Sequence, residues 1–158
     1  MSSDLKTYVE QYEAATKRFE NLVVTLVEEE LDAKHPDGWS PRQIIHHVAD
    51  SEAQSYARIR RLIAEPLGSL IQSYDEEAWA KNPTLGYEDS DIANSFAVFH
   101  AVRASTLDLL KRLDESDLER YGEHSESGQY TVRQWLESYV AHPDEHAEQL
   151  KRALQRQL

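Results

Sequence analysis

Four segments of the chain carry apolar residues at a spacing of three to four positions, with polar or charged residues between them. This spacing places the apolar side chains on one face of a helix. We therefore expect four long helices, at about residues 4–30, 41–65, 90–113 and from 131 to near the C-terminus. No segment shows the sustained apolar and polar alternation of a half-buried strand. The pattern predicts an all-α, up-and-down four-helix bundle.

Two of these helices have clear N-terminal signals. Ser40 with Gln43, and Thr131 with Gln134, each form a capping box, in which side chain and backbone satisfy each other's free amides. Pro41 strengthens the first signal, because a missing amide costs nothing at the first helical position. The second and fourth helices should therefore start at these residues.

The connection between the second and third helices, residues 66–89, is longer than most loops of a compact domain. Tyr74 and Trp79 argue against disorder there. We expect a partly helical connection, with a short helix that covers one end of the bundle. Residues 122–128 are interpreted as an exposed loop that leaves His124 solvated.

Composition narrows the class of protein. The chain has 158 residues with 40% hydrophobic content, which suits one domain spanning residues 1–158. Its formal net charge of −12 repels phosphate backbones, so we expect no nucleic-acid partner. Residues 1–6 are mostly polar, and no apolar run approaches the ~20 residues of a membrane span. We expect a soluble, unprocessed, cytoplasmic protein.

Histidine provides the candidate chemistry, because the chain has no cysteine and any metal must bind His, Asp or Glu. His142 and His146 lie at i and i+4 on the apolar face of the fourth helix, a spacing that one metal ion can bridge. The alternative is two core histidines bonded to Asp and Glu. Residues 142–146 also match H-x-x-E-H, but only 12 residues follow His146, too few for the further ligand of that class. We interpret Glu145 as solvated.

His47 is the best candidate for a third ligand, because it lies at the edge of the apolar face of the second helix. His46 points to the opposite side, and His100 is interpreted as structural. In an up-and-down bundle the second and fourth helices run parallel, and an axial offset of ~6 Å would bring His47 level with His142. Three histidine ligands leave open coordination positions, which mark a catalytic site.

Residues 39–51, 74–79 and 139–146 together resemble the DinB/YfiT-like superfamily of metalloenzymes, and most of all its bacillithiol-transferase-like branch. The resemblance implies a four-helix bundle that binds Zn2+ or Ni2+ through His47, His142 and His146. It also implies hydrolase activity or transfer of a low-molecular-weight thiol. The resemblance and the long apolar stripe of the first helix lead us to expect a homodimer.

The chain departs from the family pattern at residues 143–145, where relatives have a histidine-rich run. Pro143 removes the hydrogen bond to the carbonyl of Tyr139 and should kink the helix at the site. The histidine pair is retained. The chemistry of the surrounding pocket, and with it the substrate, can differ from that of the family.

Three functions remain open. The first is a thiol S-transferase, in which a bound divalent metal deprotonates a small-molecule thiol and directs it toward an electrophile. Arg58, Arg60 and Arg61 could meet an anionic thiol, although a solvated or salt-bridged face is the simpler interpretation. The second is a hydrolase that uses metal-bound water on a hydrolysable substrate. The third is a non-catalytic, stress-associated metal-binding bundle. The sequence assigns no catalytic or substrate-binding side chain.

Overall fold

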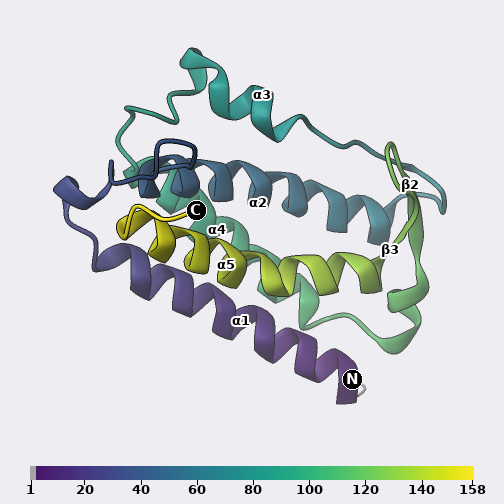
Figure 1. Ribbon diagram of the computed structural model, residues 1–158. Coiled ribbons are helices and arrows are strands. Elements are labelled where there is room, and N and C mark those ends of the chain that lie inside the picture. The colour runs from purple at the N-terminus through teal and green to yellow at the C-terminus, as the bar shows by residue number, and fades with distance from the viewer. Residues whose placement is uncertain (1–2) are drawn as a thin grey trace.

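Four long helices form the frame of the computed structural model, which describes residues 3–158 (Figure 1). Met1 and Ser2 lie outside the described residues. The long helices are α1 (Ser3–Val24), α2 (Pro41–Ala64), α4 (Ala93–Leu110) and α5 (Val132–Leu154). The expected helical bundle is confirmed. Among the described residues, none of the helices has the length and apolar character that crossing a bilayer requires.

Both predicted helix starts are present. The amide of Gln43 donates to Ser40 Oγ at 3.2 Å, and the amide of Ser40 donates to Gln43 Oε1 at 2.8 Å. Thr131 and Gln134 repeat this arrangement at the start of α5. The first helix is shorter than expected and gives way to a short 3-10 helix, η1 (Glu28–Glu30). The β-branched residues 23–25 favour that early end, because their side chains are restricted in a helix.

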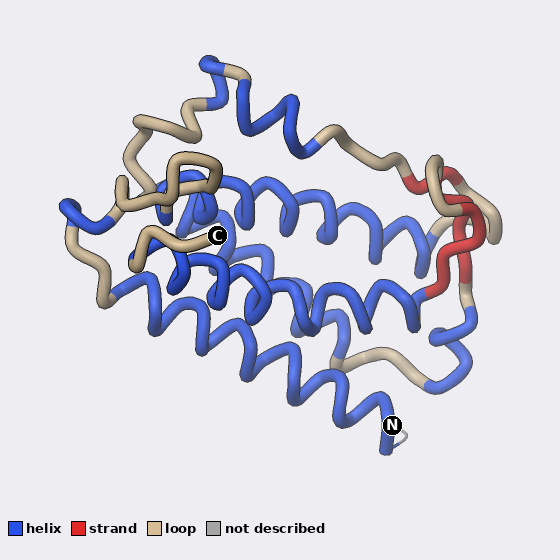
Figure 2. The backbone as a smooth tube through the Cα atoms, viewed as in Figure 1, coloured by secondary structure: helices blue, strands red, loops and turns tan. Residues whose placement is uncertain are grey.

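The relative directions of the long helices differ from those of the expected up-and-down bundle. His46 of α2 contacts Ser95 of α4, and Arg60 of α2 contacts Ser105 of α4. Because residues later in α2 contact residues later in α4, the two helices are parallel. The expected parallel run of the second and fourth long helices is wrong. The long connection carries the chain back along α2 before α4 begins, so α5 runs antiparallel to α2 (Figure 2).

The connection itself contains strand β1 (Leu70–Ile71), helix α3 (Glu76–Lys81) and the 3-10 helix η2 (Pro83–Leu85). Its partly helical character is as expected. Asp75 caps α3 by accepting the amide of Ala78 at 3.0 Å. The helix lies along the side of α2, and does not cover an end of the bundle (Figure 1).

A small three-stranded sheet includes β1 of that connection. Strands β2 (Tyr121–His124) and β3 (Gly128–Thr131) form an antiparallel hairpin, and β1 pairs with β2 in parallel. The expected exposed loop at residues 122–128 is therefore wrong. These strands have two to four residues, too few to show an alternating pattern. Gly122 allows the close approach, because a Cβ there would lie 2.7 Å from Ile71 Cγ1.

The core consists of two apolar clusters separated by a polar layer. One cluster contains Tyr12 and Trp135, and the other contains Phe19 and Phe99. Buried Glu52, Ser55, Arg103 and Thr106 lie between them along the helices. The apolar stripe of α1 is buried in this core, so it does not provide a surface for a second chain. The homodimer stays a prediction that rests on the family resemblance.

Candidate metal centre

The structure brings the three predicted histidines together. His47, His142 and His146 each offer one ring nitrogen, and these atoms lie within 4.8 Å of one another. The antiparallel run of α2 and α5 explains their meeting. His47 lies seven residues after the cap of α2, and His146 lies eight residues before the end of α5. The two histidines therefore occupy the same level, and no axial offset is needed.

The hydrogen bonds of these rings leave nitrogens free for a metal. Nδ1 of His142 donates to Glu52 Oε1 at 2.9 Å, and Nδ1 of His146 donates to Gln149 Oε1 at 2.8 Å. Because both partners are oxygen acceptors, each proton sits on Nδ1 and each Nε2 keeps its lone pair. Nδ1 of His47 is buried without a hydrogen-bond partner. Three ring nitrogens within 4.8 Å of one another, with one buried ring nitrogen of His47 lacking a hydrogen-bond partner, fit a shared divalent cation.

The electrostatics keep two of these rings in the metal-binding form. Burial lowers the pKa of His47 to about 3, and repulsion from protonated His146 and His142 adds to this shift. Burial also lowers the pKa of His146 to about 4, together with the effect of His142. Both imidazoles are neutral at pH 7, and a neutral ring is the form that coordinates a metal.

Glu52 is a site residue that the sequence analysis missed. Its carboxylate is fully buried behind His142, and Arg103 Nη1 lies 3.1 Å from the same Oε1. Burial alone would raise its pKa, but the charge of Arg103 and the hydrogen bonds from His142 and Ser55 outweigh that effect and lower it. Glu52 therefore stays ionised and orients His142. The sequence does contain a signal for Glu52, because a glutamate next to the apolar stripe of a helix is buried only when it has a charged or polar partner.

Arg103 also compensates for the proline in α5. The helix continues past Pro143 to Leu154, although Pro143 has no amide for the carbonyl of Tyr139. Nη1 of Arg103 donates to that carbonyl at 2.8 Å. The same guanidinium donates to the carbonyl of Tyr12 and the hydroxyl of Thr16 on α1. One buried side chain from α4 thus joins α1, α2 and α5.

His46 faces away from the three histidines, as expected, but it is buried. Its Nε2 donates to the carbonyl of Ser90 at 3.0 Å, and its Nδ1 accepts from Ser95 Oγ at 2.7 Å. Both nitrogens are therefore used, and the ring has no lone pair for a metal. The parallel neighbour α4 covers the helix face that we expected to lie outside. His100 is exposed, and its ring bonds Glu20 on α1, a partner that spacing within one helix could not reveal.

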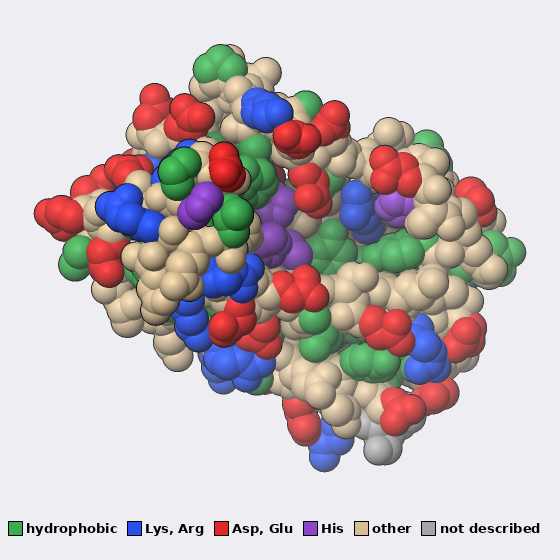
Figure 3. Space-filling view, in the orientation of Figure 1, with side chains coloured by type: hydrophobic (Ala, Val, Ile, Leu, Met, Phe, Trp, Pro, Cys, Tyr) green, Lys and Arg blue, Asp and Glu red, His purple; other side chains and the backbone are tan. Residues whose placement is uncertain are grey.

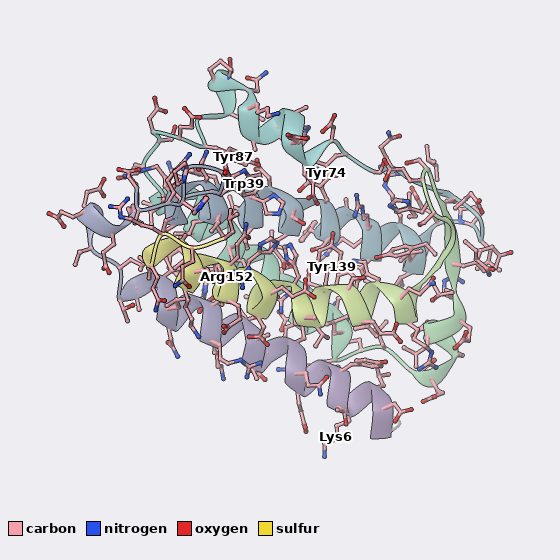
Figure 4. The ribbon with its side chains drawn as sticks, in the orientation of Figure 1. Lys6, Trp39, Tyr74, Tyr87, Tyr139 and Arg152 are labelled. Carbon is pink, nitrogen blue, oxygen red and sulfur yellow. The ribbon has the colours of Figure 1, made fainter. Side chains whose placement is uncertain are left out.

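An open cavity of about 480 Å³ adjoins the three histidines. Figure 3 shows histidine at the centre of this hollow and a basic side chain farther along it, with acidic side chains nearby. The ring of Trp39 contacts His47 and that of Tyr139 contacts His142, so aromatic rings bracket the cluster (Figure 4). His124 lines the cavity from the hairpin, which corrects its expected solvated position.

Two further side chains that the sequence leads us to expect in solvent border the cavity. Glu145 is exposed, as expected, but it borders the cavity. Arg58 is half-buried in the wall, and its guanidinium bonds the hydroxyl of Tyr139. The expected salt-bridged face is present at Arg61, which pairs with Glu65, whereas Arg58 is only partly solvated and bonds neutral groups.

Comparison with known proteins gives a consistent result. A family model described as the DinB superfamily matches residues 11–150. Two proteins of Oceanobacillus iheyensis, both named as proposed metal-dependent hydrolases, are 31% and 26% identical to the chain. They cover 90% and 96% of it, and 81% and 86% of their own lengths. Among solved structures, YfiT from Bacillus subtilis is described as a probable metal-dependent hydrolase with an unusual four-helix bundle topology. It matches with a TM-score of 0.85 at 25% identity, over 99% of this chain and 89% of its own.

Proposed function

The chain belongs to the DinB superfamily, and we propose that it is a metal-dependent enzyme that transfers a small-molecule thiol to an electrophile. The observation that carries the proposal is a cluster of three histidines, each with an available nitrogen, on the wall of an open cavity. The relatives named as metal-dependent support a divalent metal at such a cluster. We propose Zn2+ or Ni2+, both of which three imidazoles accept.

The metal would be held by His47, His142 and His146, with Glu52 orienting His142. When bound, it would supply a Lewis acid that lowers the pKa of a coordinated S–H or O–H group. The chain has no cysteine, so the thiol substrate would bring the only sulfur nucleophile of the reaction.

Side chains on the cavity wall would accept and donate the protons of the reaction. The thiol proton leaves to solvent or to the carboxylate of Glu145, the S–C bond forms, and the leaving group departs with its electron pair. Burial raises the pKa of Tyr139, so its hydroxyl stays protonated and can donate to the departing group. With an epoxide, that group is the ring oxygen.

Hydrolysis is the second candidate, in which water takes the place of the thiol. The names of the relatives favour it, as does Glu145, which borders the cavity next to His146 in sequence. A carboxylate in that place can accept the proton of an attacking water.

One assay separates these functions. Protein loaded with Zn2+ or Ni2+ is given a thiol with an epoxide or alkyl halide, and separately a nitrophenyl ester without thiol. We expect thioether product in the first arm, lost in His47→Ala. Ester cleavage alone would favour the hydrolase. Activity in neither arm would contradict an enzyme and leave a metal-binding bundle.

A further inference from the structure

We propose that the cavity beside the histidines contains an anion-binding subsite centred on Arg58, so that the thiol substrate carries a carboxylate or similar anionic group. The inference rests on the proposed function, because it assigns a substrate class to the same cavity. Arg58 and His124 are the side chains that would recognise the anion.

The guanidinium of Arg58 is held in place without a negative partner. Its Nη1 donates to the hydroxyl of Tyr139 at 3.2 Å, and its Nη2 donates to the carbonyl of Gln72 at 3.0 Å. Both acceptors are neutral. Its Nε is buried and has no hydrogen-bond partner. Among residues 3–158, no carboxylate oxygen lies within 4.0 Å of its nitrogens.

The two fully buried arginines of the chain are neutralised, whereas half-buried Arg60 and Arg120, like Arg58, bond neutral oxygens. Arg42 pairs with Glu28 and Asp32, and Arg103 pairs with Glu52. The chain has 29 acidic and 17 basic residues, so acidic partners are plentiful. Arg58 differs from Arg60 and Arg120 in that it lines the cavity beside the histidines, where its unpaired charge is available to a ligand. Its fork of N–H groups matches a carboxylate.

His124 provides a second donor on the same wall. Its Nδ1 accepts from the amides of Glu126 and Ser127, at 3.2 and 3.3 Å. The proton of the neutral ring therefore sits on Nε2, which makes that nitrogen a donor. The ring packs on Tyr130 and lines the cavity together with Arg58. Glu76 and Glu145 also border the cavity, but neither pairs with Arg58.

Tyr139 sets the distance between this subsite and the histidines. Its hydroxyl bonds Arg58, and the centroid of its ring lies 5.4 Å from that of His142. A thiol that reaches the histidines with its sulfur would place a carboxylate at Arg58 only if several bonds separate the two groups. The geometry therefore favours an extended, anionic thiol over a short neutral one.

The test compares glutathione with its diethyl ester, which has the same thiol but no free carboxylate. Thiolate binding to the cobalt-loaded protein is followed by the visible absorption band that a sulfur ligand produces. We expect the native chain to bind glutathione about tenfold more tightly than the ester, as for one charge-assisted hydrogen bond. Arg58→Gln should abolish this preference and leave ester binding unchanged.

The matched control is Arg60→Gln, because Arg60 stacks on Tyr56 and bonds α4, away from the cavity. It should keep the tenfold preference. Equal affinities of the native chain for the two thiols, or a preference that survives in Arg58→Gln, would overturn the subsite.

A second measurement is independent of the metal and of thiol chemistry. S-Methylglutathione keeps both carboxylates but has no thiol, and it is titrated into metal-free protein while the Arg58 Nε–H resonance is followed by NMR. A saturable shift of this resonance that glutathione diethyl ester does not cause supports the subsite. This result would hold even if neither thiol binds the cobalt protein and the proposed thiol transfer fails. No shift would overturn the subsite, whatever the enzymatic result.

Discussion

Arg103 donates a hydrogen bond from Nη1 to the main-chain oxygen of Tyr139 across 2.8 Å. This oxygen has no helical donor, because Pro143 lacks an amide. Pro143→Ala should restore the helical bond and raise the free energy of unfolding by about 1 kcal/mol, the usual net value of one hydrogen bond. Urea unfolding of the metal-free protein measures the change. A lower stability would mean that the packing of the proline ring outweighs the missing bond.

The same relationship predicts a coupling between the two positions. Arg103→Met should destabilise the native chain strongly, because it leaves Glu52 buried and unpaired and the Tyr139 carbonyl without a donor. In the Pro143→Ala background the carbonyl keeps an amide donor, so Arg103→Met should cost about 1 kcal/mol less. A double-mutant cycle gives this difference, and additive effects would contradict the proposed compensation.

Glu52 should matter for both metal affinity and stability. Glu52→Gln weakens the hydrogen bond that orients His142, so we expect metal affinity to fall ~10 to 100-fold. It also leaves buried Arg103 without a counter-charge, at a cost of about 3–5 kcal/mol. Calorimetric titration and thermal unfolding measure the two effects. The matched control is Glu20→Gln, whose carboxylate bonds exposed His100, and it should change neither quantity appreciably.

The adjacent histidines should differ in metal affinity. His47→Ala removes one of three proposed ligands, so its loss should exceed the ~10 to 100-fold typical of an outer-shell change. His46→Ala should leave affinity nearly unchanged, because both nitrogens of His46 bond α4 and its flanking residues. Both variants should remain helical, with His46→Ala less stable. Calorimetric zinc titration decides this, and equal losses would refute the proposed ligand set.

The metal-free protein should lose stability on mild acidification. The pKa of His47 is about 3 and that of His146 about 4, both below the ordinary value of 6.5. Between about pH 6.5 and 3 the unfolded chain binds more protons at these two histidines than the folded one, so stability falls as pH decreases through this window. It is fully present above pH 6.5. Urea unfolding at pH 7 and pH 5 tests this, and His47→Gln should flatten the dependence.

Self-association remains a proposal, supported by the family resemblance. A two-fold dimer is the commonest arrangement of identical chains. Light scattering at high protein concentration should then give twice the 18.2 kDa mass of one chain. A constant monomer mass over the whole concentration range would exclude the dimer.

The sequence could predict those features that depend on local patterns. Helix starts at Ser40 and Thr131 follow from residues three positions apart, and His142 with His146 from spacing within one helix. The pairing of Glu52 with Arg103 could not be predicted in this way, because it joins two helices whose relative direction depends on the long connection.

The same limit explains the other differences. Antiparallel α2 and α5, buried His46 and the cavity position of His124 all depend on how distant segments pack. The strands of the small sheet have two to four residues, and such short strands give no periodic signal.

The separation of the histidines along the chain has a consequence for biosynthesis. His142 lies 90 residues beyond Glu52, on α5, which is synthesised after the other three long helices of the bundle. A nascent or truncated chain that ends before α5 has one histidine of the three and cannot hold the cation with three imidazoles. Binding of a cation by all three imidazoles would therefore have to follow the synthesis and docking of α5. A bound cation would thus stabilise chains in which α5 has docked and leave chains without it exposed to proteolysis.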